Sequence, residues 1–534
     1  MIKILIKNRL RSLFGTMVNK SRDGSAVKGG QGRIALVILL YIFLIGSFAF
    51  MSTTMAIALG SVLIPIGAEW LYFAVFIIAT LSVIFILSIF ETKSELFECK
   101  DNDLLLSMPI KPRDIVASRV SVVLIYNYLE ELVIMLPCII VYGVLSHDPV
   151  GVLGALIVSI FIPLLATALA SVCGYGVAMI SKLFKKKTAI SVILYLLFFG
   201  AYMLGYEALI EGFDSFIADT ESSGTVANIP FLYYIGAAAL FEPLSITLTV
   251  LISLTAAFVC YFFVSKSYIK IVTSNYTPHA TYKDRTHRTH SPLFSLVQKE
   301  ISHFFSSAIY ILNGGIGYIF MVAIGVFLVV KSNELTAVAE ELFRDVSEPV
   351  AVLLPILVCA VIFMSSFGVI SAATLSLEGK RLWIIKTMPI DSRTLLLSKA
   401  LPQLVISFLP TLITSLLLII ACKAGIEYWL FIIIIPQLAN AFFALFGTVI
   451  NTAFPKFEFQ NEAEVIKQSL SSFIVMMSNM LISLILIGLT FLLCITVHSL
   501  VAFSLLLVLF LLLSVAMYFV LTRISTKRYD KFDV

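Results

Sequence analysis

Charged residues are scarce in this chain of 534 residues, where Asp, Glu, Lys and Arg make up only 13%. Soluble domains usually contain about 25%. Apolar residues make up 60%, with 42 Phe and 20 Tyr, which is more large apolar surface than one soluble core can bury. This composition excludes a soluble enzyme, a disordered chain and a nucleic-acid-binding protein. It leaves an integral membrane protein with many helical spans.

Motifs of metal sites and of catalysis are also missing. The seven Cys are scattered without a Cys-x-x-Cys pair, so we expect neither a disulfide framework nor a metal site. A nucleotide-binding P-loop is absent, because Gly379-Lys380 is followed by Arg381 where Ser or Thr is required. The zinc motif His-Glu-x-x-His is absent as well. We therefore expect no catalytic residue and no cofactor in this chain, and we expect that it is not an enzyme.

Long apolar runs dominate what is present. A membrane-spanning helix needs roughly 20 apolar residues, whereas the strands of a β-barrel would alternate between apolar and polar residues. The run 229–241 is too short to cross and predicts a re-entrant or interfacial helix. The predicted fold class is an all-α polytopic membrane protein with twelve transmembrane helices. We expect the spans at 34–55, 70–90, 120–145, 150–180, 189–208, 244–264, 309–330, 349–372, 400–421, 428–452, 469–493 and 499–522.

Basic residues predict the orientation of these spans. If the N-terminus is cytoplasmic, 34 of the 37 Lys and Arg residues fall in segments on the cytoplasmic side. Cytoplasmic loops of membrane proteins carry such an excess. We therefore expect both termini in the cytoplasm and a location in the plasma membrane. No cleavable signal peptide is expected, because the first apolar run follows a basic segment of 33 residues.

The two halves of the chain match each other at three places in the same order. Residues 98–119 match 378–399 at a constant offset of 280, with seven of 22 positions identical. Residues 163–174 match 436–447 at an offset of 273. The third match, at an offset of 291, pairs two amphipathic stretches before the first span of each half: Ile6, Leu10, Leu13, Phe14 and Met17 with Val297, Ile301, Phe304, Phe305 and Ala308.

These matches predict two parallel six-helix repeats, each preceded by an amphipathic entry helix on the inner membrane surface. The predicted domains are a first half at 1–264, a cytoplasmic linker at 265–292 and a second half at 293–534. The linker contains His279, His287 and His290 among basic residues. A metal site there would need carboxylates or Cys nearby, so a solvated basic loop near anionic lipid is the favoured interpretation.

The segments 98–119 and 378–399 each predict a short apolar helix, a break and a new helix that enters the next span. Pro109 and Pro389 disfavour helix in the residue before them. The new helix begins near Pro112 in the first half and near Asp391 in the second. One interpretation is a rigid apolar surface that docks a partner, and the other is a tight loop that Pro merely ends. Repetition at a constant offset favours docking.

These features together resemble the permease of type-2 ATP-binding-cassette (ABC) exporters, of which this chain looks like a fused, twelve-span form. The features are a basic amphipathic entry helix, six spans, and a segment between spans two and three in which Glu precedes Met-Pro-Ile-x-x-Arg. In that family this segment is the coupling helix that fits a groove on the ATPase subunit. The resemblance implies contacts by Glu98, Leu104, Leu105, Met108, Pro109 and Arg113 in the first half, and by Glu378, Trp383, Ile384, Met388, Pro389 and Arg393 in the second.

The same resemblance implies a separate ABC ATPase subunit, with two copies expected because the chain has two coupling segments. ATP and Mg would bind to that partner, and the cargo would be an exported peptide, lipid or drug-like molecule. The second half departs from the family, because only about five residues separate spans eleven and twelve, which leaves little room for an extracellular gate.

Two other function classes remain open. A proton-coupled secondary transporter also has twelve spans in two halves, and Glu130-Glu131 near the middle of span three would carry its protons. A non-transporting membrane scaffold or sensor is the third class. In a transporter, Glu130 and Glu131 would contact the cargo pathway between the halves. Asn127, one turn before Glu131, would line that pathway as well. The alternative is structural, with one or both carboxyls protonated and hydrogen-bonded between helices.

Overall fold

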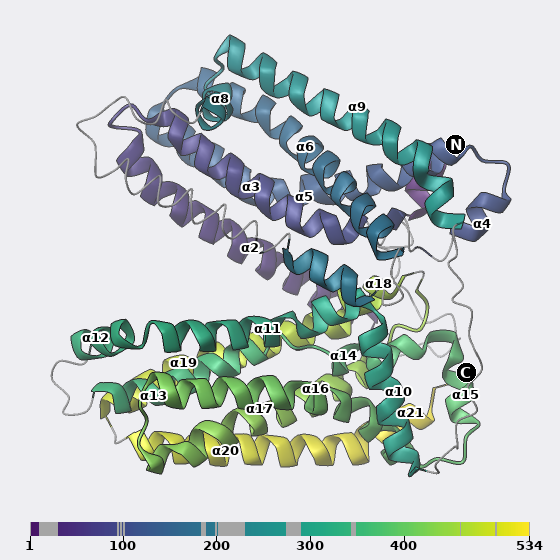
Figure 1. Cartoon of the computed structure of the whole chain (residues 1–534), viewed down its shortest axis with the longest axis vertical. Helices are drawn as coiled ribbons and strands as arrows, with labels where there is room; N and C mark the ends of the chain where they lie inside the picture. Colours follow the sequence, from purple (N-terminus) through teal and green to yellow (C-terminus); the bar gives the residue numbers. More distant parts are fainter. Residues whose placement is uncertain are drawn as a thin grey trace. The chain divides into compact units, whose positions relative to one another are not determined.

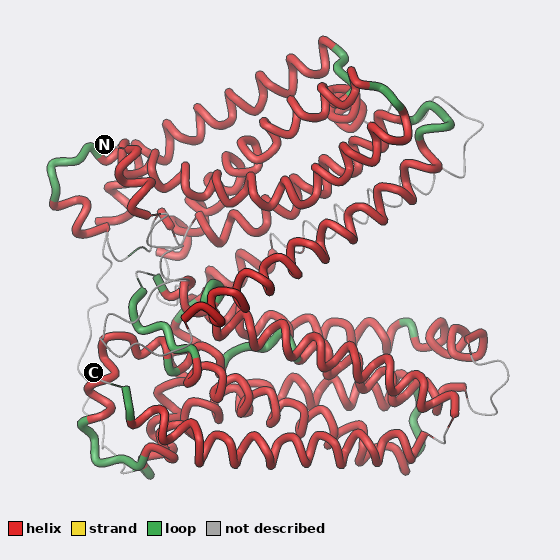
Figure 2. The backbone as a smooth tube through the Cα atoms, turned by 180° about the vertical axis from the view of Figure 1, so that it is seen from behind, coloured by secondary structure: helices red, strands yellow, loops and turns green. Residues whose placement is uncertain are grey.

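The computed structural model divides into two compact units, Met1–Ala280 and Thr281–Val534. It describes residues 2–9, 30–92, 95–96, 99, 102–182, 188–197, 200, 230–273, 290–342, 349–459, 461–496 and 499–532. These residues form helices joined by loops, and no strand occurs among them (Figure 2).

The first unit is a bundle of long helices that run side by side (Figure 1). A short helix over residues 2–9 precedes them. A short apolar helix, Thr188–Leu197, follows α6. The labelled helices are α2 (Gly30–Leu63), α3 (Glu69–Thr92), α4 (Asn102–Ser107), α5 (Pro112–Ser146), α6 (Pro149–Lys182), α8 (Pro230–Ala239) and α9 (Pro243–Thr273).

The second unit is a bundle with the same order of long helices, preceded by α10 (Pro292–Ser306). Its long helices are α11 (Ala308–Val330), α13 (Pro349–Ser365), α16 (Ser392–Ala421), α17 (Ile426–Ala453), α19 (Leu470–Thr496) and α20 (Ser499–Val520). Its short elements are α12 (Ser332–Leu342), α14 (Ser371–Thr374), the 3₁₀ segment η3 (Ser376–Arg381), α15 (Leu382–Lys386), α18 (Glu462–Ile466), the π-helical η4 (Leu521–Ser525) and α21 (Thr526–Asp530).

The polytopic all-α prediction is confirmed. Within the described residues, ten helices are long and apolar enough to cross a membrane. Two shorter apolar helices, Thr188–Leu197 and Val350–Ser365, lie in the predicted spans five and eight. Span five is described only to residue 197 and at residue 200, so the rest of the predicted span 189–208 lies outside the described residues. Each unit therefore contains six of these twelve apolar helices.

Proline sets the beginning of many of these helices. Its ring fixes φ near the helical value, and the N–H that it lacks would have no partner in the first turn. Six described helices begin on a proline: α5, α6, α8, α9, α10 and α13. Helix α5 thereby starts at Pro112, eight residues before the predicted span, and continues without a break into it.

The short helix α8 confirms that a helix forms in the run 229–241. Glycines bring its backbone close to its neighbours in the first unit. A Cβ atom on Gly236 would lie 1.9 Å from the carbonyl oxygen of Trp70, and one on Gly154 would lie 2.4 Å from that of Ala239. Larger residues would push α8 away from α3 and α6, so these glycines are required for the close approach.

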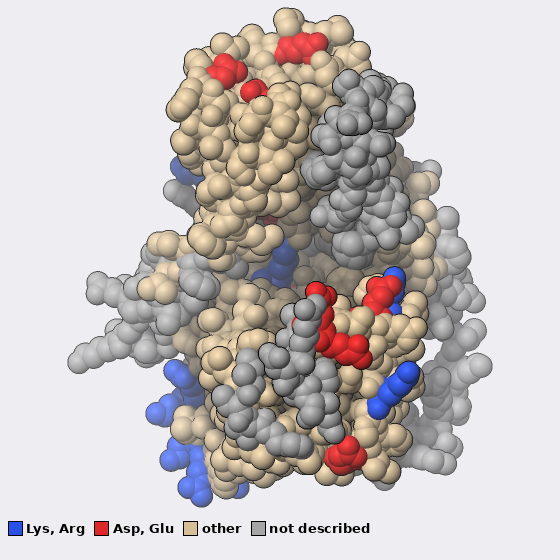
Figure 3. All heavy atoms as spheres, turned by 90° about the vertical axis from the view of Figure 1, so that its left-hand side faces the viewer, with Lys and Arg blue, Asp and Glu red and all other residues tan. Residues whose placement is uncertain are grey.

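Side chains that face outward on the long helices are apolar. Val330 is 74% exposed and Ile426 is 80% exposed, as expected for helices that contact lipid. Figure 3 looks at the side that faces the left of Figure 1, where helix ends lie: the described surface there is mostly uncharged, with separate groups of Asp and Glu and a few Lys and Arg. The chain thus has the surface of a membrane-embedded protein.

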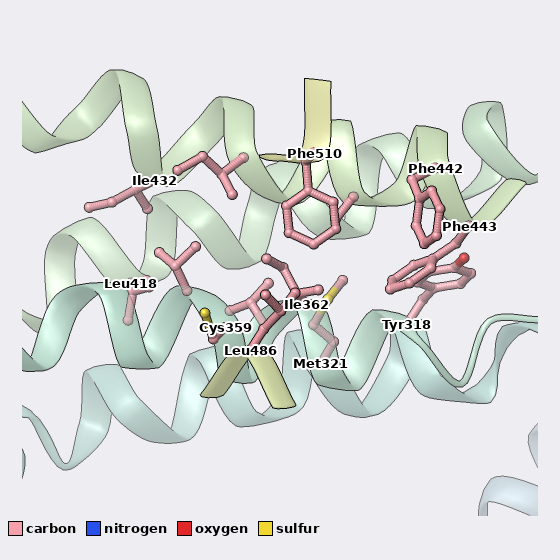
Figure 4. Packing of buried hydrophobic residues seen from close by; sticks show 14 of the residues in the cluster. Tyr318, Met321, Cys359, Ile362, Leu418, Ile432, Phe442, Phe443, Leu486 and Phe510 are labelled. Atoms are coloured by element: carbon pink, nitrogen blue, oxygen red, sulfur yellow. The ribbon is translucent and has the colours of Figure 1, made fainter. Parts of the chain in front are cut away.

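The core of the second unit contains large apolar side chains from several helices. Figure 4 shows Met321, Cys359, Ile362, Leu486 and Phe510 pointing toward one another. Phe510 is fully buried, and its ring lies 6.4 Å from that of Phe442, measured between ring centroids. Because lipid is as apolar as these residues, packing contacts rather than exclusion of water hold the helices together.

The prediction of a continuous span over 349–372 is wrong, because α13 ends at Ser365 and α14 begins only at Ser371. Gly368 lies in the break, and a Cβ atom there would be 2.2 Å from the hydroxyl oxygen of Tyr318. Non-helical backbone away from water needs other hydrogen-bond partners. Gln403 of α16 supplies them: its amide donates to the Gly368 carbonyl at 2.8 Å and accepts the Ser371 N–H at 2.9 Å.

We predict that Gln403→Leu lowers the stability of the second unit, because two buried backbone groups lose their partner. The expected cost is about 1–3 kcal/mol for each group. Thermal unfolding of the purified protein in detergent, followed with a thiol-reactive dye, measures it, since six of the seven free cysteines are buried. Gln437→Leu is the matched control, because Gln437 is exposed where it donates to the Phe408 carbonyl. Equal midpoints for the two variants would contradict the prediction.

Candidate functional site

The predicted short segments of the two units form matched turns with the same backbone hydrogen bonds. In each turn an i to i+3 bond closes the short helix, and an i to i+2 bond follows across the proline. These bonds run from Met108 N to Leu105 O (3.3 Å), Ile110 N to Met108 O (2.7 Å), Met388 N to Ile385 O (3.2 Å) and Ile390 N to Met388 O (2.8 Å). Every donor and acceptor is related by the offset of 280. The i to i+2 bond is that of a γ-turn, whose inverse form needs a central φ close to the one proline provides.

Both turns present apolar side chains on their surface. Leu104 is 59% exposed and Met108 is 41% exposed in the first turn. In the second turn the matching residues are Ile384 (39%) and Met388 (42%), and Trp383 adds a further exposed ring (55%). Exposed residues of this kind outside the spans are typical of a protein-binding surface. We call these two groups the first and second docking turns, after the docking role that the sequence predicts for them.

The docking turns contact residues from the last part of their own unit. In the first unit, the buried Tyr268 of α9 donates its hydroxyl to the side-chain oxygen of Asn102, at the start of α4, at 3.1 Å. In the second unit, residues after α20 take this place: Lys386 of α15 donates to the Phe532 carbonyl, and Ser392 donates to Asp530 at 2.6 Å. Each docking turn is therefore supported by residues far away in the sequence.

A cluster of buried charges lies behind the second docking turn. The ammonium group of Lys399, 1% exposed, lies 2.7 Å from Glu300 of α10 and also pairs with Glu378 of η3. Lys299, which is half-exposed, donates to Glu378 at 2.6 Å. Burial alone would raise the pKa of the Glu378 carboxyl, but the charges of Lys399 and Lys299 lower it to about 2. The cluster joins the entry helix, the docking turn and α16.

His303 connects helix α10 to helix α18. Its ring nitrogen lies 3.4 Å from the Glu462 carboxylate of α18. This contact raises the pKa of His303 above its usual value, against the effect of burial, and the nearby carboxylates of Glu300 and Glu378 add to the rise. The buried side of α10 consists of Leu296, Glu300 and Phe304, while Phe305 is exposed and Ala308 belongs to α11.

The first unit builds an equivalent cluster from different residues. Arg9, in the helix over residues 2–9, makes a bidentate contact with Glu95 at 2.7 and 3.0 Å. Arg119 of α5 lies 3.6 Å from the same carboxylate, and the three side chains are 3–10% exposed. Arg119 matches Lys399 at the offset of 280. The carboxylate differs, because Glu98 is the match of Glu378 in the sequence.

The structure separates the predicted contact residues into two groups. Leu104, Met108, Pro109, Arg113, Trp383, Ile384, Met388, Pro389 and Arg393 are exposed. Glu378 points inward to the cluster, with its side chain 9% exposed. Leu105 is half-buried and packs on the core beneath the first turn. Glu98 lies outside the described residues, as does most of the histidine-containing linker.

The candidate pathway residues lie in α5 and differ in environment. Asn127 is fully buried, accepts a hydrogen bond from Ser88 of α3 at 2.7 Å and donates one to Thr167 of α6 at 2.7 Å. Glu131, one turn further, is 2% exposed. Glu130 is half-buried on a neighbouring face of the helix. Asn127 thus joins three helices, and this bonding is what the sequence alone did not reveal.

Sequence reasoning missed the two charge clusters and the role of Gln403. Two signals were available for the clusters. A charged residue, Glu300, interrupts the apolar face of a predicted amphipathic helix, and Arg119 matches Lys399 in the repeat. A buried charge needs a partner of opposite sign, so these positions pointed to each other. No comparable signal exists for Gln403, since a glutamine in an apolar run has many possible partners.

A family model described as "Membrane protein of 12 TMs" matches residues 35–527, which is nearly the whole chain. The match supports twelve spans. No curated protein matches the chain.

We predict that Lys399→Met strongly destabilises the second unit, because it leaves the buried carboxylates of Glu300 and Glu378 with only the half-exposed Lys299 as a base. Breaking a buried ion pair in this way costs about 3–5 kcal/mol. Lys299→Met serves as the control, because that side chain is 49% exposed and exposed pairs contribute about 1 kcal/mol or less. Thermal unfolding midpoints measure both effects, and a control variant as unstable as Lys399→Met would refute the buried cluster.

Acid should weaken the same cluster. Because the pKa of Glu378 is lowered to about 2 in the folded protein, its ionised form adds stability above its ordinary value of 4.5, and this part is lost as the pH falls toward 2. Comparing the wild type with Glu378→Gln isolates the effect from other carboxylates. The difference between their unfolding midpoints should shrink between about pH 5 and pH 3. A difference in midpoint that does not change with pH would show that the cluster does not lower the pKa of Glu378.

Proposed function

The chain belongs to this family of membrane proteins with twelve transmembrane segments, and from that premise we propose that it is the membrane-spanning subunit of an ABC transporter. In this proposal a separate subunit hydrolyses ATP and holds the Mg, and the membrane subunit exports a peptide, lipid or drug-like cargo. The observation that carries the proposal is the pair of docking turns, which share their backbone hydrogen bonds and expose apolar side chains at matched positions.

The docking turns suit a partner that binds twice. Interfaces gain most of their affinity from a few buried apolar or aromatic anchors, and tryptophan is prominent among these. Trp383, Ile384 and Leu104 are anchors of this kind, and the buried charge clusters fix the backbone behind them. A rigid turn transmits force in both directions, so movement of a bound ATPase would reach α5 and α16 directly, since these helices begin at the turns.

The orientation proposed follows from the distribution of basic residues. Both docking turns lie in segments rich in Lys and Arg, which favours the cytoplasmic side. A cytosolic ATPase would then reach the turns of a protein in the plasma membrane, and both termini would lie on the same side. Export rather than import is implied by the resemblance to type-2 exporters.

A proton-coupled secondary transporter is the second candidate function. The observation that favours it is Glu131, a carboxylate that is 2% exposed in the middle of a membrane-spanning helix. Such groups commonly mark proton or ion pathways. This candidate leaves the two matched docking turns without a role, which is why the ABC subunit is preferred.

We expect that Leu104→Asp and Ile384→Asp each weaken binding of the ATP-binding subunit. A charge in the centre of an apolar contact costs about 2 kcal/mol or more, so the affinity should fall roughly 30-fold or more, and less of the subunit should be recovered. The measurement is the ratio of ABC ATPase to tagged chain after purification from membranes, quantified by mass spectrometry. Two copies of ATPase per wild-type chain are expected.

Ser107→Ala and Thr387→Ala are the matched controls, because these exposed residues also correspond at the offset of 280 and make only local hydrogen bonds. They should keep the wild-type ratio. Recovery of a fully active transporter without any bound ATPase would overturn the proposal and leave the secondary transporter as the explanation.

A further inference from the structure

Glu131 is a buried carboxylate that does not join α5 to another helix. It is 2% exposed, and its Oε1 atom has no hydrogen-bond partner. It lies one helical turn after Asn127, so both side chains are on the same face of α5. Asn127 bonds to Ser88 of α3 and Thr167 of α6, which are neighbours within the first unit. Glu131 therefore points into the interior of this unit, where lipid and bulk water are excluded.

Among the residues that the structure describes, the helices packed against α5 offer Glu131 no base. These helices are α2, α3, α6 and α9. Their charged residues lie close to the helix ends: Arg33 in α2, Glu69 and Glu91 in α3, Lys182 in α6, and Lys266 and Lys270 in α9. Their tyrosines and cysteines, such as Tyr72 and Cys173, are neutral groups.

Helix α5 itself does not supply a base either. The nearest one is Arg119, twelve residues away and about 18 Å along the axis, and it pairs with Glu95. Tyr128 donates its hydroxyl to the Ile160 carbonyl, and Glu130 is acidic. A carboxylate in an apolar interior with no cation takes up a proton rather than remain charged.

The second unit contains an equivalent set of hydrogen bonds between its helices, and this set includes no carboxylate. The residue that matches Glu131 at the offset of 280 is Thr411 of α16. It accepts a hydrogen bond from the amide of Asn440 at 2.8 Å, and Asn440 in turn accepts one from Ser365. An amide thus joins two hydroxyls from neighbouring helices in both units, and Asn440 matches Thr167 at the offset of 273. The bonding is complete in both units without a carboxylate.

We infer that Glu131 is a proton-binding site that the first unit has and the second lacks. Its carboxyl carries a proton in the conformation described, and it gives that proton to water, forming carboxylate and hydronium, when water enters the interior between α3, α5 and α6. Thr80, eight residues before Ser88 on α3, is fully buried with its hydroxyl unpartnered, and it offers a further polar group in this interior. This inference does not depend on the ATPase partner.

Infrared spectroscopy of the full chain in dodecyl maltoside, a detergent without carbonyl groups, tests the inference directly. At pH 7 the wild type should show the carbonyl-stretch band of a protonated carboxylic acid. The band should disappear in Glu131→Gln and remain in Glu130→Gln, which is the neighbouring control. A wild type without this band at pH 7, or a Glu131→Gln variant that keeps it, overturns the inference. The absence of the band in the wild type would decide against the inference even where a variant does not fold.

Thermal unfolding gives a second readout that a purely structural role would not change. A group that binds a proton in the folded protein and releases it on unfolding makes the protein less stable as the pH rises. The wild-type midpoint should therefore fall between about pH 5 and pH 9, the range reached by buried carboxyls. Glu131→Thr, which copies the second unit, should fold and lose this decline, while Glu130→Gln should retain it. Equal pH dependence in the wild type and Glu131→Thr overturns the inference.

Discussion

The ammonium group of Lys399 is the interaction on which the turn-bearing end of the second unit depends. It is enclosed between Glu300 and Glu378, and these three side chains come from α16, α10 and η3. A buried charge is tolerated only with partners at the correct distance, so the ammonium group fixes where all three segments lie. The exposed surface of the second docking turn follows from this arrangement, because the turn begins directly after η3.

The two units reach the same arrangement with different chemistry. Arg119 and Lys399 occupy matched positions, yet one contacts Glu95 and the other Glu300 and Glu378. The amide that joins three helices is on α5 in the first unit and on α17 in the second. What repeats is the requirement for a polar or ionic bond at a given place. The identity of the residue that provides it is free to change, which explains why few positions in the repeat are identical.

The sequence was sufficient for features that depend on local rules. Apolar runs predicted the spans, and Pro112 and Asp391 predicted where two long helices begin. Features that depend on distant partners were not predictable. Helix α13 ends at Ser365 because Gln403 bonds the backbone after it, and no rule of spacing connects these residues. In the same way, the offset of 280 pointed to Glu98, whereas Glu95 is the carboxylate that pairs with Arg9. Docking of an ATPase on these turns is a prediction from the repeat and from the resemblance.

Each docking turn is supported by residues far along the chain, so it can be completed only after those residues have been synthesised. Asn102 bonds to a tyrosine 166 residues later, and Lys386 bonds to a carbonyl 146 residues later. At the usual rates of translation these supports appear roughly 7–30 s after the turns themselves. A nascent chain whose last helices are not yet inserted therefore has unfinished docking turns. If the proposed partner binds these turns, its recruitment would wait until each half of the protein is complete.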